Sequence, residues 1–173
     1  MAQAANFSAV ELLRDGRRIE IRAIRPSDRA ALLAAVGFTS SRSLYRRFFG
    51  VKRGFSEKEI SYFLNVDFVN HVALVAVTNE GGREIIVGGG RSVVVGPGTA
   101  ELAFMIVDKY QGKGLGGALL RDLVALARSA GLRELTAEVL PDNVAMLKVF
   151  ENSGLSVSTK REAGVVRVSI RLS

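Results

Sequence analysis

The sequence predicts an α/β (α+β) fold: a mixed, mostly antiparallel sheet with one strand–helix–strand crossover, flanked by helices on both faces. Short β-rich runs follow one another across turns that contain glycine, which is typical of antiparallel hairpins. One long amphipathic helix lies between two strand-like runs, which is typical of a parallel crossover. The 173 residues contain no linker, repeat or low-complexity segment, so we expect a single domain over 1–173.

The first third of the chain predicts one strand and then three helices. The expected elements are a strand at 17–24 and helices at about 28–37, 41–49 and 56–64. The strand is indicated by alternating polar and apolar residues. A Pro-Ser-Asp run ends it and provides caps for the first helix. The third helix begins with Ser56 and Glu59, the spacing of a capping box.

The rest of the chain predicts a meander, a crossover and a closing hairpin. The expected strands are 71–78, 85–95, 99–107, 132–140, 155–160 and 165–172, and the expected helices are 113–130 and 141–153. Residues 88–90 are all glycine, and we expect them to interrupt the second of these strands. Gly131 and Gly154 end the two helices.

Composition excludes several classes of site. The chain has no Cys and one His, which excludes a disulfide framework, a thiolate nucleophile and a zinc site. It has neither an apolar run near the ~20 residues of a membrane span nor a signal peptide, so a cytoplasmic protein is expected. Residues 1–53 hold 11 of the 24 basic and 4 of the 17 acidic residues, the whole net charge of +7. This excess could attract nucleic acid, an acidic protein or a phosphorylated cofactor, or form a solvated helical face.

The most informative segment is the glycine-rich turn at 107–117, VDKYQGKGLGG, between a strand and the long helix. Glycines let a backbone approach a ligand closely. The first N–H groups of a helix have no internal acceptors, so with the helix dipole they form a site for phosphate. Lys113 adds a cation. Packing of the helix against the sheet is the alternative explanation for the glycines.

Two nucleotide-binding motifs fit this turn less well than a third. A P-loop fails because Gly117 is followed by Ala-Leu rather than Lys-Ser/Thr. A dinucleotide fingerprint is matched by the glycines at 112, 114 and 117, with Glu134 about twenty residues on. That fingerprint belongs to the first unit of a repeating parallel sheet, whereas about a hundred residues of helices and hairpins precede it here.

The third motif resembles the acyl-CoA pyrophosphate motif Gln/Arg-x-x-Gly-x-Gly/Ala of the GNAT N-acetyltransferase superfamily, carried by Gln111-Gly112-Lys113-Gly114-Leu115-Gly116. The resemblance covers nearly the whole chain. IRAIRPSD at 21–28 is similar to the opening strand of that superfamily, and PDNVAML at 141–147 with Phe150 to its later Asn-containing helix. SLYRRFF at 43–49 and AELAF at 100–104 resemble the acetyltransferase domain of bacterial protein lysine acetyltransferases.

The resemblance implies acetyl-CoA as cosubstrate and no metal. The strands ending at Val107 and starting near Leu135 would splay apart around the pantetheine arm. Its amides would pair with backbone groups near Met105, Ile106 and Val107. The pyrophosphate would lie on the amides of 112–117, including those of Gly116 and Gly117. Asn143 would contact the arm or a water, although it could equally cap its helix, and Phe150 would pack near the thioester.

The chemistry implied is acyl transfer from a thioester to an amine. A lysine-type amine has a pKa of ~10.4 and must lose a proton before attack. With no Cys and one His, a carboxylate is the expected base. Glu101 is the candidate and Glu138 the reserve; a surface role at a strand edge is the alternative. Burial of Glu101 would raise its pKa towards a useful range. The oxyanion would be held by a strand amide, that of Ile106.

Some features leave the mechanism open. Many members of the superfamily carry a Tyr seven residues after the Asn, which protonates the leaving thiolate, but here that residue is Phe150; no general acid is named. His71 begins an apolar strand, where a structural role is expected. Arg42, Tyr45 and Arg46 share one helix face. With Arg47, they could guide an acidic substrate or bind the 3′-phosphate of CoA, or be solvated charge.

The sequence therefore predicts an acyl-CoA-dependent N-acetyltransferase that moves an acetyl group directly to a primary amine, with a glutamate as general base. The acceptor would be a protein lysine or a small amine. A non-catalytic acyl-CoA-binding regulatory module is the alternative. A nucleic-acid-binding module is disfavoured because the basic third has few aromatics and no recognition motif. No membrane partner is expected, and homodimer formation is left open.

Overall fold

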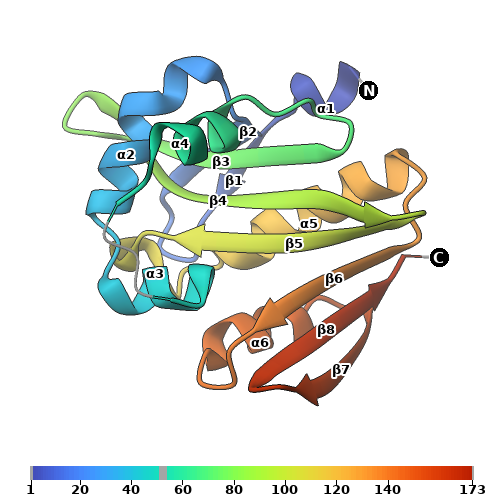
Figure 1. Cartoon of the computed structure of the whole chain (residues 1–173). Helices are drawn as coiled ribbons and strands as arrows, with labels where there is room; N and C mark the ends of the chain where they lie inside the picture. The colour runs from blue at the N-terminus through green and yellow to red at the C-terminus, as the bar shows by residue number, and fades with distance from the viewer. Residues whose placement is uncertain (1, 51–53, 173) are drawn as a thin grey trace.

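The computed structural model describes residues 2–50 and 54–172. Its centre is an eight-stranded sheet of order β1-β2-β3-β4-β5-β6-β8-β7 (Figure 1). The strands are β1 Ser8–Leu12, β2 Arg18–Ala23, β3 His71–Glu80, β4 Arg83–Gly96, β5 Thr99–Ile106, β6 Glu134–Val139, β7 Ser156–Glu162 and β8 Val165–Arg171. The helices are α1 Ala2–Ala5, α2 Arg29–Gly37, α3 Ser41–Phe48, α4 Glu57–Leu64, α5 Leu115–Ser129 and α6 Val144–Glu151, with 3-10 turns η1 Pro26–Asp28 and η2 Asp108–Tyr110.

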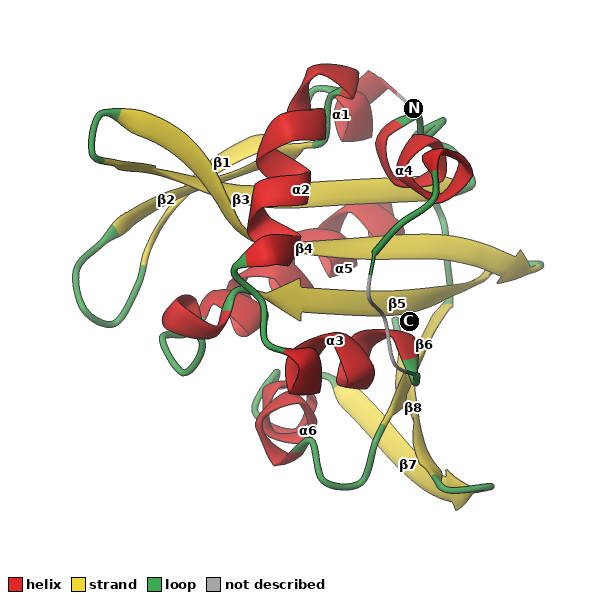
Figure 2. Cartoon of the chain, turned by 60° about the vertical axis from the view of Figure 1, so that its left-hand side comes forward, coloured by secondary structure: helices red, strands yellow, loops and turns green. Residues whose placement is uncertain are grey.

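The sheet confirms the predicted fold class. Strands β3, β4 and β5 form an antiparallel meander, and β5 and β6 are a parallel pair joined across α5. Helices α2 and α5 lie on opposite faces of the sheet (Figure 2). Each face has its own hydrophobic core. On the α5 face, the core includes Leu115, Leu119 and Leu123, each at most 1% exposed.

The glycine triplet at 88–90 does not interrupt a strand, which corrects the prediction. β4 runs without a break from Arg83 to Gly96. A Cβ on Gly90 would lie 2.9 Å from Leu123 Cδ1, and a Cβ on Gly88 would lie 3.1 Å from Leu115 Cδ2. The glycines therefore allow α5 to pack closely on the centre of the sheet, as strand glycines do where another element approaches.

The N-terminal elements were not predicted. β1 pairs antiparallel with β2 at the edge of the sheet, and its residues are exposed or only half-buried. A strand with no buried side chain carries a weak periodic pattern, which explains why the sequence did not indicate it. By contrast, the start of α4 was predicted correctly: Ser56 Oγ accepts from Glu59 N–H at 3.1 Å, and Glu59 Oε1 accepts from Ser56 N–H at 3.0 Å.

Candidate functional site

β5 and β6 separate after a short paired stretch. Three residue pairs join them, the last being Glu101 with Thr136. β5 then continues to Ile106 and β6 to Val139, and the two strands diverge (Figure 1). Among the residues that the structure describes, neither facing edge has a strand partner beyond this point. The opening, here called the fork, thus exposes backbone groups that could pair with an extended ligand.

The alternation of hydrogen bonds along β5 decides which backbone groups face the fork. Val107 N–H donates to Val87 O of β4 at 3.0 Å. Because successive residues of a strand direct their N–H and C=O groups to opposite edges, Met105 also faces β4. The groups that face the fork are those of Phe104 and Ile106. This corrects the expectation for the amides of Met105 and Val107 and adds Phe104, which the sequence analysis missed although a period of two could have indicated it.

The glycine-rich turn lies at the open end of the fork. Gly112 and Gly114 have φ of 73° and 93°, a left-handed region that favours glycine. Gly114 caps α5, whose first backbone hydrogen bond is Ala118 N–H to Gly114 O at 3.2 Å. The N–H groups of residues 115–117 therefore have no acceptor within the helix. Such groups, together with the helix dipole, are suited to an anionic ligand.

Two neighbouring glycines at this helix start have different roles. A Cβ on Gly116 would lie 3.2 Å from Val149 Cγ2 and 3.5 Å from Ile106 Cδ1, so Gly116 allows α5, α6 and β5 to pack together. A Cβ on Gly117 would meet nothing within 4 Å. Packing of the helix therefore explains Gly116, whereas the backbone at Gly117 is unobstructed. The open backbone at Gly117 is compatible with the predicted pyrophosphate site, which stays a prediction.

Helix α3 connects the two sides of the fork. Gln111 Nε2 donates to Ile106 O at 2.9 Å and to Ser43 Oγ of α3 at 3.1 Å. On the other side, Arg46 Nη2 donates to Asp142 O at 3.2 Å and lies 3.6 Å from Asp142 Oδ2. The Nε of Arg46 is buried and without a partner in the described part of the chain. Gln111 therefore holds the end of β5 to α3 through its side chain.

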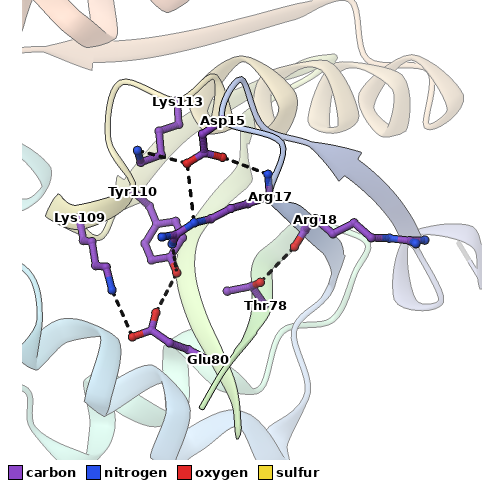
Figure 3. A network of polar contacts seen from close by, with 8 residues as sticks. All are labelled: Asp15, Arg17, Arg18, Thr78, Glu80, Lys109, Tyr110 and Lys113. Atoms are coloured by element: carbon purple, nitrogen blue, oxygen red, sulfur yellow. Dashed lines mark hydrogen bonds and ion pairs between the residues drawn. The ribbon is translucent and has the colours of Figure 1, made fainter. Parts of the chain in front are cut away.

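A network of polar contacts holds the glycine-rich turn to neighbouring parts of the sheet (Figure 3). Tyr110 is 2% exposed; its hydroxyl donates to Glu80 Oε2 at 2.9 Å and accepts from Arg17 Nη1 at 2.9 Å. Lys109 Nζ lies 3.3 Å from Glu80 Oε1. Burial and the bond to Glu80 raise the pKa of Tyr110. The network therefore ties the turn to the β1–β2 and β3–β4 hairpins.

Lys113 is held on the same side. Its Nζ lies 3.3 Å from Asp15 Oδ2, and its carbonyl accepts from Arg14 N–H at 3.1 Å. The backbone N–H of Arg17 and then Lys113 hold the pKa of Asp15 below its ordinary value. The cation that the sequence indicated for an anionic ligand is thus partly neutralised by a carboxylate of the chain.

The candidate base lies where the fork begins. Glu101 is exposed on β5 rather than buried or partly buried. It is on the face of the sheet that carries α3, together with its cross-strand neighbour Thr136 and the exposed Glu138. Thr136 is 4% exposed, and its Oγ1 has no hydrogen-bond partner among the described residues. Such an atom is commonly satisfied by water or a ligand, and the sequence analysis did not identify it.

Asn143 and Phe150 both have structural contacts within the chain, and the ligand contacts that the resemblance implies for them stay predictions. Asn143 Oδ1 accepts from Met146 N–H at 3.3 Å, so the residue caps α6, the alternative that the sequence left open. Phe150 is 1% exposed, and its ring packs edge-on against Phe104 with centroids 6.1 Å apart. It belongs to the core beneath the fork rather than to the open surface.

The basic residues of α3 are divided between two surroundings. Arg42 and Tyr45 are exposed, and Arg46 contacts Asp142. Arg47 is half-buried and lines a small cavity on the same face of the sheet as Glu101. His71, expected to be structural, is 8% exposed and lies 3.0 Å through Nε2 from Arg91 Nη1.

Neither a metal-binding group nor a membrane-spanning helix occurs in the described part of the chain. No group of three His, Asp or Glu side chains in the described part of the chain could hold a metal ion. Within residues 2–50 and 54–172, no helix is long and apolar enough to span a membrane.

The chain is similar to known proteins over most of its length. The family model described as "Acetyltransferase (GNAT) domain" matches residues 18–156. The chain is 32% identical over 158 residues to acetyltransferase Pat of Mycolicibacterium smegmatis, covering 91% of this chain and 47% of that protein. The chain thus spans about half the length of this curated relative.

Two solved structures are also similar. The GNAT domain of S. lividans PAT superposes with a TM-score of 0.86 at 35% identity, covering 95% of this chain and 96% of that one. yncA of Salmonella typhimurium, solved with its cofactor acetyl-CoA, superposes with a TM-score of 0.71 at 19% identity over 90% and 94% of the two chains. The latter likeness concerns the fold alone.

Proposed function

Because the chain belongs to the GNAT acetyltransferase family, we propose that it transfers an acetyl group from acetyl-CoA to a primary amine by direct attack. The observation that carries this proposal is the fork: two strands that pair at three positions and then separate, with the bare N-terminus of α5 at the open end. An extended arm fits the strand edges, and a diphosphate fits the helix N-terminus.

The chain's own residues would contribute in three ways. The N–H groups of residues 112–117 would bind the diphosphate. The amides of Phe104 and Ile106 face the fork, where they could pair with the arm and hold the oxyanion. Glu101 would accept the proton of the incoming amine through a water, which suits its exposed position.

The neutral amine attacks the thioester carbonyl, a C–N bond forms, and the C–S bond breaks. The nitrogen loses a proton towards Glu101, and the leaving thiolate takes up a proton from solvent. A thiol of pKa ~8.5 is a good leaving group without a dedicated acid, which is compatible with Phe150 standing where many relatives have Tyr.

A thiol-release assay with Glu101→Gln tests this function. We expect a 10²–10⁴-fold lower kcat, the usual contribution of a general base, with CoA affinity unchanged. Glu134→Gln, an exposed carboxylate at the start of β6, is the charge-matched control. Loss of activity in Glu138→Gln instead would transfer the role to the reserve candidate. CoA binding without thiol release from any amine would favour the alternative, an acyl-CoA-binding regulatory module.

A further inference from the structure

Two arginines from distant parts of the chain line one cavity on the α2–α4 face of the sheet. Arg47 comes from α3 and Arg91 from β4. The cavity has a volume of about 60 Å³, and the rest of its lining is apolar, including Phe48, Phe63, Ala103 and Met105. Ala103 and Met105 follow Glu101 at alternate positions of β5, so the cavity, here called the basic pocket, opens on the same strand face as the candidate base.

Arg91 is held in place by its neighbours. Its Nη2 donates to Phe63 O at 2.7 Å, and its Cζ lies 4.8 Å from the centroid of the Phe63 ring. Its Nη1 lies 3.0 Å from His71 Nε2. A guanidinium only donates hydrogen bonds, so Nε2 is the acceptor and the neutral ring carries its proton on Nδ1. The guanidinium is thus oriented before any ligand arrives.

The positive charge of the basic pocket is not neutralised by ion pairs. Within residues 2–50 and 54–172, no carboxylate lies within 4.0 Å of a nitrogen of Arg47 or Arg91. Burial, and then the charge of Arg47, lowers the pKa of Arg91 to about 10. Burial also lowers the pKa of Arg47, an effect that Tyr62 and then Glu101 partly counteract. Partly buried charges without a counter-ion are unfavourable, so an anionic ligand would stabilise this arrangement.

We infer that the amine acceptor carries a carboxylate group, which Arg47 and Arg91 bind in the basic pocket while the amine lies towards Glu101. This inference rests on the proposed function and names its acceptor class. A guanidinium matches the planar carboxylate with two parallel hydrogen bonds. A cavity needs about 10–15 Å³ for each water it holds, so about 60 Å³ admits a carboxylate. The aromatic walls would pack against the carbon skeleton of the acceptor.

The carboxylate could belong to a free amino acid or to an acidic residue beside a lysine of a peptide, and paired acceptors separate these sources. One pair is leucine and leucinamide. The other is the blocked tripeptide Glu-Lys-Glu and its Gln-Lys-Gln counterpart. Amidation of leucine lowers the pKa of its amine, so ionisation alone favours the amide. A preference for the acid therefore reports recognition of the carboxylate.

We expect the acid of at least one pair to have a KM at least tenfold lower than its amide, the size expected for charged hydrogen bonds. Arg47→Gln should remove most of that preference, and Arg47→Lys should keep part of it. Arg161→Gln, an exposed arginine on β7, is the charge-matched control and should keep all of it. Equal KM values within both pairs of the unchanged protein would overturn the inference, whatever the variants do.

A binding measurement separates this inference from the proposed function. N-acetyl-leucine and N-acetyl-leucinamide are compared as stabilisers of the whole chain in thermal unfolding, with no acetyl transfer needed. A larger shift for the acid that is lost in Arg47→Gln supports the basic pocket even if no amine is acetylated. Acetyl transfer without any preference for the acid, in either assay, leaves the function standing and removes the carboxylate site.

Discussion

The two candidate sites near the fork use different chemical groups: one uses the main chain and the other uses side chains. On the α5 face and along the fork, the candidate donor site consists of main-chain groups: the amides of Phe104, Ile106 and residues 112–117. On the α2–α4 face, the basic pocket is lined by the side chains of Arg47 and Arg91 within an otherwise apolar wall. A main-chain site depends on backbone conformation and carries no titrating group, whereas a side-chain site depends on charge and burial. Substitutions and pH should therefore affect the two sites differently.

The largest expected effect is at the glycine turn. Gly114→Ala forces a side chain into φ of 93° and would displace the amides of the turn. We expect CoA to bind about 100-fold more weakly, since a misplacement of 1 Å in a positioned site can have that effect. Isothermal titration calorimetry with CoA measures it.

Gly164→Ala is the matched control. Gly164 has φ of 81° in the β7–β8 turn; an added Cβ would meet nothing within 4 Å there, and one on Gly114 would meet only Arg14, at 3.6 Å or more, so backbone strain dominates in both variants. It should destabilise the fold by a similar amount, about 1–2 kcal/mol, and leave CoA affinity unchanged. Equal CoA affinity in the two variants would show that the glycine turn does not bind CoA.

On the α2–α4 face, His71 should make the protein less stable in acid. Burial and the nearby Arg91 lower the pKa of His71 to about 4, from 6.5 in an unfolded chain. Below pH 6.5, the unfolded chain therefore binds the proton more readily, and stability is lost as pH falls towards 4. Between pH 7.5 and 5, this group should remove about 2 kcal/mol of unfolding free energy.

Urea unfolding at the two pH values checks this effect, and His71→Gln isolates it. Gln retains a hydrogen-bond acceptor for Arg91 and cannot titrate, and His71 is the single histidine of the chain. The variant should lose less stability than the unchanged protein between pH 7.5 and 5. An identical loss in both proteins would contradict the buried, neutral state of His71.

A smaller effect is expected for the support behind the glycine turn. Tyr110→Phe removes the hydroxyl that bonds Glu80 and Arg17 (Figure 3). Loss of these bonds should lower stability by about 1–1.5 kcal/mol and weaken CoA binding several-fold, with the KM of the acceptor unchanged. Thr78→Val removes one hydrogen bond to Arg18 O beside the same network without touching the turn. A change of CoA affinity in Thr78→Val as large as in Tyr110→Phe would argue against a specific support.

The smallest effect concerns Asp122 of α5, whose contribution to stability changes with pH in the opposite direction to that of His71. Asp122 is 8% exposed, its Oδ2 has no partner among described residues, and burial, then Glu11, raises its pKa to about 6. The folded chain therefore binds this proton more tightly than the unfolded chain, and stability is lost as pH rises through about 6. Asp122→Asn should add about 1 kcal/mol at pH 7.5, measured by urea unfolding, whereas the exposed Glu151→Gln should not. A loss of stability in Asp122→Asn at pH 7.5 would contradict this account.

The contrast between the main-chain site at the glycine turn and the side-chain site of the basic pocket also explains what the sequence could predict. The glycine turn, the crossover and the meander are encoded by neighbouring residues, so local patterns indicated them. Gln111 and the glycines that follow it form one contiguous motif whose meaning depends on backbone conformation. The predicted interruption of β4 was wrong because the reason for its glycines is the packing of α5, a contact between elements distant in sequence.

The basic pocket could not be predicted in this way. Arg47, Phe63, His71 and Arg91 come from two helices and two strands, and no local pattern brings them together. In the sequence, Arg47 was one of four helix residues that could guide an acidic substrate, bind the 3′-phosphate of CoA or be solvated charge, and nothing linked it to Arg91. Likewise, Glu101 was identified by resemblance, but its exposure and its place beside Thr136 follow from where β5 and β6 separate, which only the folded sheet determines.

Amide hydrogen exchange of the chain with and without CoA tests the central claim most directly. The account predicts that CoA slows exchange at the N–H groups of residues 112–117 and of Phe104 and Ile106, while the amides of Met105 and Val107, which face β4, change little. Tight binding of CoA with unchanged exchange at residues 112–117 would contradict it.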